Sequence, residues 1–340
     1  MKLREILEKY KFPAAAIDIV TKGGIEDLYP PQIETIHKGL LDKKNILLSV
    51  PTAAGKTLMA ELCMLRAILH DGGRCLYIAP LKALASEKYE DFKEKYSVLG
   101  IKVGIATGDL DTPPSRLLGE YQIIIATAEK VDSLLRNKAQ WFIQSLSVVI
   151  LDEIHFINDG SRGPTMEILT ARIKQLNPNI QIVALSATVK NAEEMADWLN
   201  ANLVLSKWRP IPLKEGVYYN EMIQFDNYGT KLIREEAADD LSKMTLDTLR
   251  GKGQVLVFVN SRRSAQAASR QISPSVSLTL TAEEKKELIS LSKEIIGPAS
   301  SSTQVCRKLG EVITHGVAFH HAGLKPNQRK LVENYFKKNL

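Results

Sequence analysis

Short apolar runs recur through the first part of the chain, and amphipathic stretches separate them. The apolar runs lie at 46–50, 75–79, 103–106, 122–126, 148–151 and 181–185. Between them, apolar residues recur with the spacing of a helix at 57–70, 83–96 and 164–176. This alternation is typical of an α/β domain, in which helices cover both faces of a parallel sheet. We therefore expect such a domain over residues 1–205, with ligands at the carboxyl ends of its strands.

The pattern changes at a proline-marked stretch, 207–212, which we interpret as the crossing into a second unit over 206–340. Thr281 and Glu284 have the spacing of a capping box ahead of a helix in this unit. The pattern also predicts strands at Val255–Val259 and Val317–Phe319 and a last helix at 326–338. A second unit with so few strands would have a sheet with an open edge, and complete proteins cover such edges. We therefore expect the chain to be part of a longer protein.

The first apolar run leads into a short loop, Val50-Pro51-Thr52-Ala53-Ala54-Gly55-Lys56-Thr57, that precedes a helix-prone stretch. The loop resembles the phosphate-binding pattern G-x-x-x-x-G-K-[ST], except that Val50 stands where the strict pattern has Gly. Backbone N–H groups of such a loop and the positive end of the following helix hold phosphate oxygens. Lys56 would reach the β- and γ-phosphates, and the Thr57 hydroxyl would ligate Mg²⁺.

The apolar run 148–151 ends in two adjacent carboxylates, Asp152 and Glu153. The end of a buried strand gains no stability from such a pair, which favours a functional explanation. Asp152 would hold the same Mg²⁺ as Thr57, and Glu153 would polarise the attacking water. The loop and the carboxylates together predict a nucleotide hydrolase.

The composition is that of a globular protein of about two domains, since 44% of the 340 residues are hydrophobic and 25% are charged. No apolar run approaches the roughly 18 residues of a membrane span, so we expect no membrane partner. Cys63, Cys75 and Cys306 form no C-x-x-C pair, which favours a reducing, cytoplasmic setting and disfavours zinc. The net charge of +6 is compatible with a nucleic-acid partner but does not establish one.

Further short segments follow the loop and the carboxylates in a family's order. They are Leu28–Gln32 as a Q motif, Ala79–Leu84 as motif Ia, Thr107–Asp109 and Thr127–Lys130 as strand-tracking motifs, Asp152–His155 as a DEAH-like box, Ser186–Thr188 as motif III, Val257–Arg262 as motif IV and Phe319–Leu324 as the segment after it. With these motifs the chain resembles superfamily-two helicases of the Ski-like group, and most closely the archaeal Hjm-type DNA repair helicases. The loop without Gly at position 50 is normal for that group.

The resemblance implies tandem RecA-like parallel sheets flanked by helices: an ATP-binding lobe at 1–205 and an incomplete second lobe at 206–340. It implies an ATP- and Mg²⁺-dependent DNA helicase that acts as a monomer in DNA repair or replication restart. Its partner would be single-stranded or forked DNA, which it would unwind 3′→5′. The family's later G-x-x-x-P and Q-x-x-G-R-x-G-R motifs do not occur in the sequence. We therefore expect this chain to bind ATP and DNA but to hydrolyse ATP slowly.

The resemblance also assigns roles to single residues. Gln32 would read the adenine edge; without the surrounding motif, a glutamine here is more often a surface turn residue. His155 would contact Ser186 or Thr188, and these three residues would couple the ATP site to the second lobe. The alternative role of the Ser186 and Thr188 hydroxyls is to cap the N-terminus of a helix. Strand phosphates would be held by Lys82, Thr107, Thr127, Lys130, Arg262 and His320. The three cations among these have an alternative role as solvated surface charges.

Two rival functions remain open from the sequence. One is an RNA helicase of the same group, because motifs that grip the backbone do not separate DNA from RNA. The other is a nucleotide- and strand-binding module without catalysis, which the missing arginine motif favours for this chain.

Overall fold

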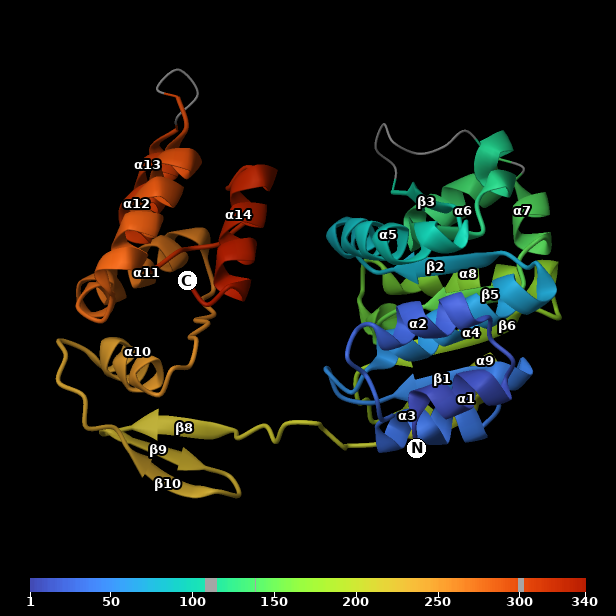
Figure 1. The fold of residues 1–340 in the computed structure, drawn as a ribbon, viewed down its shortest axis with the longest axis horizontal. Helices are drawn as coiled ribbons and strands as arrows, with labels where there is room; N and C mark the ends of the chain where they lie inside the picture. The colour runs from blue at the N-terminus through green and yellow to red at the C-terminus, as the bar shows by residue number, and fades with distance from the viewer. Residues whose placement is uncertain (108–114, 138, 299–302) are drawn as a thin grey trace. The chain divides into compact units, whose positions relative to one another are not determined.

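A computed structural model describes the chain at residues 1–107, 115–137, 139–298 and 303–340 (Figure 1). The chain divides into two compact units, Met1–Pro212 and Leu213–Leu340. The proline-marked stretch at 207–212, which we expected at the start of the second unit, groups with the first.

A seven-stranded parallel sheet forms the centre of the first unit, in the order β3-β4-β2-β5-β6-β1-β7. Its strands are β1 (Ile46–Ser49), β2 (Cys75–Ala79), β3 (Val103–Ala106), β4 (Ile123–Thr127), β5 (Val148–Leu151), β6 (Gln181–Ser186) and β7 (Asn202–Leu205). All the apolar runs that predicted strands in this unit form them, so the expected α/β architecture is confirmed.

Helices cover both faces of this sheet. They are α1 (Leu3–Lys9), α2 (Ala14–Thr21), α3 (Pro30–His37), α4 (Lys56–Asp71), α5 (Lys82–Tyr96), α6 (Ala128–Arg136), α7 (Gln140–Gln144), α8 (Gly163–Leu176) and α9 (Ala192–Leu199), with 3₁₀ turns at Leu40–Asp42, Ser97–Leu99, Ser115–Glu120 and Ile154–Asn158.

Side chains of successive strand residues enter different cores. In β2, Cys75 and Tyr77 pack into one hydrophobic cluster, and Leu76 and Ile78 pack into the other. Because side chains of a strand alternate between the faces, a strand buried on both sides is apolar throughout. This is why the strands read as continuous apolar runs in the sequence.

The second unit combines a small antiparallel sheet with helices. The sheet has the order β10-β9-β8 and consists of β8 (Gly216–Tyr219), β9 (Met222–Phe225) and β10 (Gly229–Leu232). The helices are α10 (Asp240–Arg250), α11 (Arg262–Ser277), α12 (Ala282–Ile296), α13 (Gln304–Ile313) and α14 (Pro326–Lys337). The predicted capping box of α12 is confirmed, since Thr281 and Glu284 exchange hydrogen bonds. Of the helices in the described ranges, none is long and apolar enough to cross a membrane.

The strands expected at 255–259 and 317–319 are wrong, and the antiparallel sheet was not anticipated. Both segments lie outside the named strands. A β-strand exists only when a neighbour completes its hydrogen-bond ladder, and among the described residues no strand pairs with either segment. Phe258 is consequently 87% exposed, whereas Val317 and Phe319 pack into a helical core.

We expect Ile150→Ala to destabilise the first unit by about 2–5 kcal/mol, because Ile150 lies fully buried in β5 and its loss leaves a cavity. Ile168→Ala is the matched control, since Ile168 on α8 is 59% exposed. It should change the free energy of unfolding by no more than about 0.5 kcal/mol. Urea unfolding measures both, and equal effects would contradict the burial assigned to β5.

Candidate nucleotide and metal site

Strand pairing brings the phosphate-loop sequence and the carboxylate pair to one edge of the sheet. β6 lies between β1 and β5, and Ser49 of β1 is in register with Ser186 of β6. All these strands are parallel, so the loop after β1, Asp152 after β5 and Ala187 after β6 emerge at the same carboxyl edge. Ligands of parallel sheets bind at this edge.

The loop after β1 turns sharply into α4. Ala53 and Gly55 both have left-handed backbone conformations, with φ of 69° and 77°. The Gln32 side chain is buried and donates a hydrogen bond from Nε2 to the Gly55 carbonyl at 3.2 Å. Its Oε1 accepts from the Tyr29 N–H at 2.8 Å. Gln32 therefore braces the loop, a role that its motif did not indicate.

Lys56 begins α4 and points back over the loop. Its Nζ donates to the Val50 carbonyl at 3.3 Å and lies 3.8 Å from Glu153 Oε1. The first turn of α4 contains no acidic residue, so its positive end is not neutralised from within the helix. A lysine at the start of a helix is the chemistry that binds phosphate oxygens, because its charge adds to the positive end of the helix.

Asp152 and Thr57 present the oxygen ligands that Mg²⁺ prefers. Asp152 is buried, and its Oδ1 accepts from the Glu153 N–H at 3.0 Å while its Oδ2 accepts from the Tyr77 hydroxyl at 2.6 Å. Burial, and then the Asp152 charge, raise the pKa of Tyr77, which keeps the hydroxyl protonated as a donor. The Thr57 hydroxyl accepts from Lys88 Nζ at 3.3 Å. A cation is thus already held at the oxygen assigned to the metal.

Glu153 has a left-handed backbone, with φ of 48°, which is strained for a residue other than glycine. Its Oε2 lies 3.2 Å from His155 Nδ1. That nitrogen also accepts a hydrogen bond from the Ala187 N–H at 3.3 Å. Within the described residues Oε2 is a buried atom with no hydrogen-bond donor. An acceptor left in this way suits the binding of a water molecule.

His155 joins the segment after β6 through the backbone. We expected it to contact the hydroxyl of Ser186 or Thr188, but its partner is the Ala187 N–H between them. Ser186 Oγ and Ser49 Oγ both donate to the Ala187 carbonyl, at 2.7 and 3.1 Å. The structure therefore connects the carboxylate segment to motif III through a main-chain group, and Thr188 is exposed.

The strand-binding candidates of the first unit lie around the carboxyl ends of β2, β3 and β4. Lys82 begins α5, Thr107 follows β3, and Thr127 precedes α6, which contains Lys130. Thr127 is buried and the other three are not. The motif residues Gly108 and Asp109 lie outside the described residues.

Arg262 and His320, the candidates of the second unit, occupy the start of α11 and the segment before α14. Arg262 is exposed. His320 Nε2 lies 2.8 Å from Glu333 Oε1, so part of its hydrogen-bonding capacity is already used within this unit.

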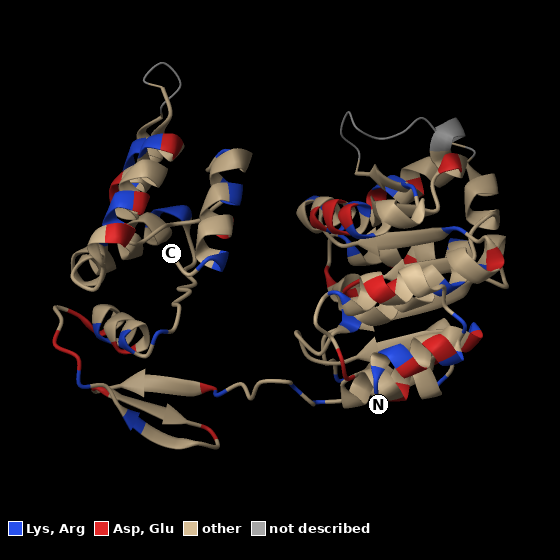
Figure 2. Ribbon diagram, viewed as in Figure 1, with Lys and Arg blue, Asp and Glu red and all other residues tan. Residues whose placement is uncertain are grey.

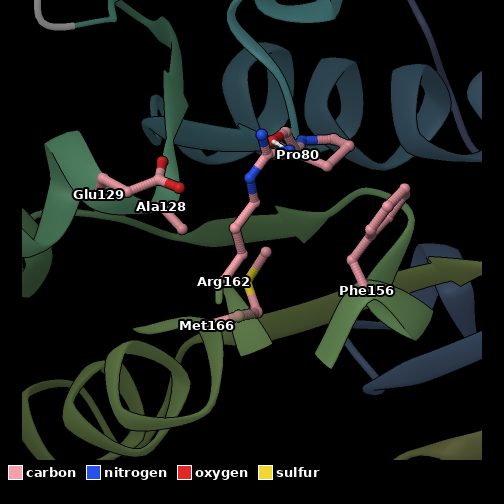
Figure 3. Close-up of a pocket in the computed structure, with 6 residues that line it drawn as sticks. All are labelled: Pro80, Ala128, Glu129, Phe156, Arg162 and Met166. Carbon is pink, nitrogen blue, oxygen red and sulfur yellow. Dashed lines mark hydrogen bonds between the residues drawn. The ribbon is translucent and has the colours of Figure 1, made fainter. Parts of the chain in front are cut away.

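Sequence reasoning missed Arg162, which contacts Pro80 of motif Ia and lies beside Glu129 of a strand-tracking segment (Figure 3). Its Nη1 donates to the Pro80 carbonyl at 3.5 Å. Together with Glu129 it borders a hollow of about 10 Å³, which has room for one water and not for a nucleotide.

The residue after Arg162 has to be a glycine, because an added Cβ on Gly163 would meet the Ile157 carbonyl at 2.0 Å. The Arg-Gly-Pro sequence at a predicted helix start was the available signal.

A parallel sheet with a phosphate-type loop and adjacent carboxylates at one edge is typical of a nucleotide-binding domain. The family model of the DEAD/DEAH box helicases matches residues 29–195, which include the loop, the carboxylates and motif III. The chain therefore contains a DEAD/DEAH box helicase domain, and the resemblance inferred from its ordered motifs is confirmed.

Curated relatives align with essentially all of the chain. It is 47% identical to the ATP-dependent DNA helicase Hel308 of Methanocella arvoryzae over all of this chain and 45% of that protein. It is 44% identical to the Hel308 of Methanocaldococcus jannaschii over 95% of this chain and 27% of that protein. It is 41% identical to the Hel308 of Pyrococcus horikoshii over 98% of this chain and 44% of that protein. The chain thus spans less than half the length of these relatives.

We expect Gly55→Ala to destabilise the chain more than Gly72→Ala does. Both glycines flank α4 with left-handed backbones, which cost an L-residue roughly 1–2 kcal/mol. An added Cβ at Gly55 would also lie 2.1 Å from Gln32 Nε2, whereas Gly72 has nothing within 4 Å. Thermal unfolding of both variants measures the difference, and equal losses would show that Gln32 moves away freely.

Proposed function

We propose that this chain forms the ATP-binding lobe and part of the strand-binding surface of an ATP-dependent DNA helicase. The observation that carries the proposal is the convergence of Lys56, Asp152 and Glu153 at the carboxyl edge of the sheet, with Lys56 Nζ 3.8 Å from Glu153 Oε1. Helicases of the matched family use ATP, usually with Mg²⁺. The relatives' names supply DNA as the nucleic acid.

In the proposed mechanism each residue acts at a defined point. Loop amides and Lys56 hold the β- and γ-phosphates, and Lys56 leaves the Val50 carbonyl to do so. Thr57 and Asp152 would hold Mg²⁺, which would neutralise phosphate charge. Glu153 Oε2 accepts a hydrogen bond from the attacking water and orients it toward the γ-phosphate. Gln32 changes from bracing the loop to reading the adenine edge.

The nucleic-acid strand crosses the segments after β2, β3 and β4, where Lys82 and Lys130 contact its phosphates. Acidic and basic residues alternate along α5, so the helix itself is not a single-sign surface (Figure 2). The electrostatic attraction of the nucleic acid therefore arises from the cations that follow the ends of β2, β3 and β4. His155 and Ala187 transmit the state of the nucleotide to the second lobe. In the whole protein this cycle would drive 3′→5′ unwinding of forked DNA, with an arginine from a G-R-x-G-R segment supporting fast hydrolysis.

Lys56→Ala should weaken ATP binding at least tenfold, because the cation at the β- and γ-phosphates is lost. Glu153→Gln should keep nucleotide and Mg²⁺ binding within about twofold, while turnover of the full-length protein falls on the order of a hundredfold or more. Calorimetry measures the binding and phosphate release measures the turnover. Wild-type ATP affinity in Lys56→Ala, or normal turnover in Glu153→Gln, would rule out the assigned roles.

Binding to a single strand should weaken steeply with salt, since each neutralised phosphate contributes about −0.7 to the slope of log affinity against log salt. Lys82→Gln should make this slope shallower by about that amount. Lys93→Gln on the same helix is the control, because Lys93 lies in the last turn of α5, whereas Lys82 begins the helix beside the end of β2. Fluorescence anisotropy with oligo-dT and oligo-U of equal length measures the slopes. Equal slopes for both variants would contradict the assignment of Lys82, and tighter binding of oligo-U would favour the RNA helicase.

A further inference from the structure

Two buried tyrosines in the first unit each donate a hydrogen bond to a buried carboxylate. The Tyr77 hydroxyl of β2 donates to Asp152 Oδ2 at 2.6 Å. The Tyr96 hydroxyl at the end of α5 donates to Glu61 of α4. Both rings are 0–1% exposed and lie in the same hydrophobic cluster, where Phe92 stands between them. Only one of these carboxylates belongs to the nucleotide site.

The position of Tyr77 follows from the register of the sheet. Tyr77 pairs with Ile150 of β5, and Asp152 lies two residues further on, so both side chains project to the same face. The Asp152 N–H also bonds to the Ile78 carbonyl at 2.9 Å, which continues the ladder past the strand end. The ring packs edge-on against Phe92 with centroids 5.6 Å apart. The Tyr77 hydroxyl is therefore fixed in position, and the Asp152 carboxylate cannot rotate without losing this hydrogen bond.

The Asp152 carboxylate is held from two sides. The Glu153 N–H occupies Oδ1 and the Tyr77 hydroxyl occupies Oδ2. A carboxylate oxygen accepts more than one partner, so each keeps a lone pair for a metal ion. Groups that orient a metal ligand in this way affect metal affinity about 10–100-fold.

We propose that Tyr77 is a positioning residue for magnesium: it sets the orientation of Asp152 before the metal arrives and so sets the Mg²⁺ concentration that nucleotide binding requires. This inference rests on the proposed function, because it assumes that Asp152 ligates Mg²⁺. Tyr77 touches neither metal nor nucleotide and acts only through Asp152. Without the hydroxyl, Asp152 samples other rotamers and the metal must order it on binding.

The test is a Mg²⁺ titration of the binding of a fluorescent ATP analogue to Tyr77→Phe, which keeps the ring and removes the donor. The half-saturating Mg²⁺ concentration should rise about tenfold or more. Affinity for the analogue in EDTA should stay within twofold. Because both titrations use one sample, partial unfolding lowers both amplitudes and leaves the two midpoints unchanged.

Tyr96→Phe is the matched control, since it removes an equivalent hydroxyl from the same cluster but from Glu61. It should lower thermal stability much as Tyr77→Phe does and leave the half-saturating Mg²⁺ concentration unchanged. An unchanged Mg²⁺ requirement in Tyr77→Phe, or an equal shift in Tyr96→Phe, would overturn the inference. Failure of the wild-type chain to bind the analogue with or without Mg²⁺ would instead reject the proposed function.

Discussion

The parallel pairing of β5, β6 and β1 is the constraint on which the site depends. It places three strand ends side by side, although the residues that follow them are distant in the sequence. A slip by one residue would turn each side chain to the opposite face. Because apolar side chains fill both faces, such a slip would expose them and bury nothing in return. The hydrophobic core therefore fixes the register, and the register fixes the distances at the carboxyl edge.

Burial of charge at this edge is balanced by specific partners. Lys56 is only 9% exposed and has the Val50 carbonyl and Glu153 nearby. Asp152 has the Tyr77 hydroxyl and a backbone N–H. Among the described atoms of the site Glu153 Oε2 is the exception, because it is buried and has no hydrogen-bond partner. This unsatisfied oxygen is the one that the proposed mechanism pairs with the attacking water molecule.

One segment of the second unit shows what happens where an apolar run has no neighbouring strand to pair with. Val255–Val259 has the composition of a buried strand, yet no strand pairs with it in the described part of the chain, and Phe258 faces solvent. The unit's core is built instead by residues of α11, α12 and α13 with Val317 and Phe319. Apolar composition alone therefore predicts a strand only where a neighbouring strand is also present.

The sequence by itself determined the features that depend on neighbours along the chain. Strands β1–β6 and helices α4, α5 and α8 of the first unit could be predicted from the sequence, as could the loop after β1, the Asp152-Glu153 pair and the capping box of α12. Periodicity and short motifs encode these features locally. Contacts between distant segments were decided by the tertiary structure. Nothing near Gln32 in the sequence indicates that it braces Gly55, and nothing near Tyr77 indicates Asp152. These partners meet only after the sheet has formed, because the pairing of whole strands, and not any residue's own neighbours, sets which side chains come within hydrogen-bonding distance.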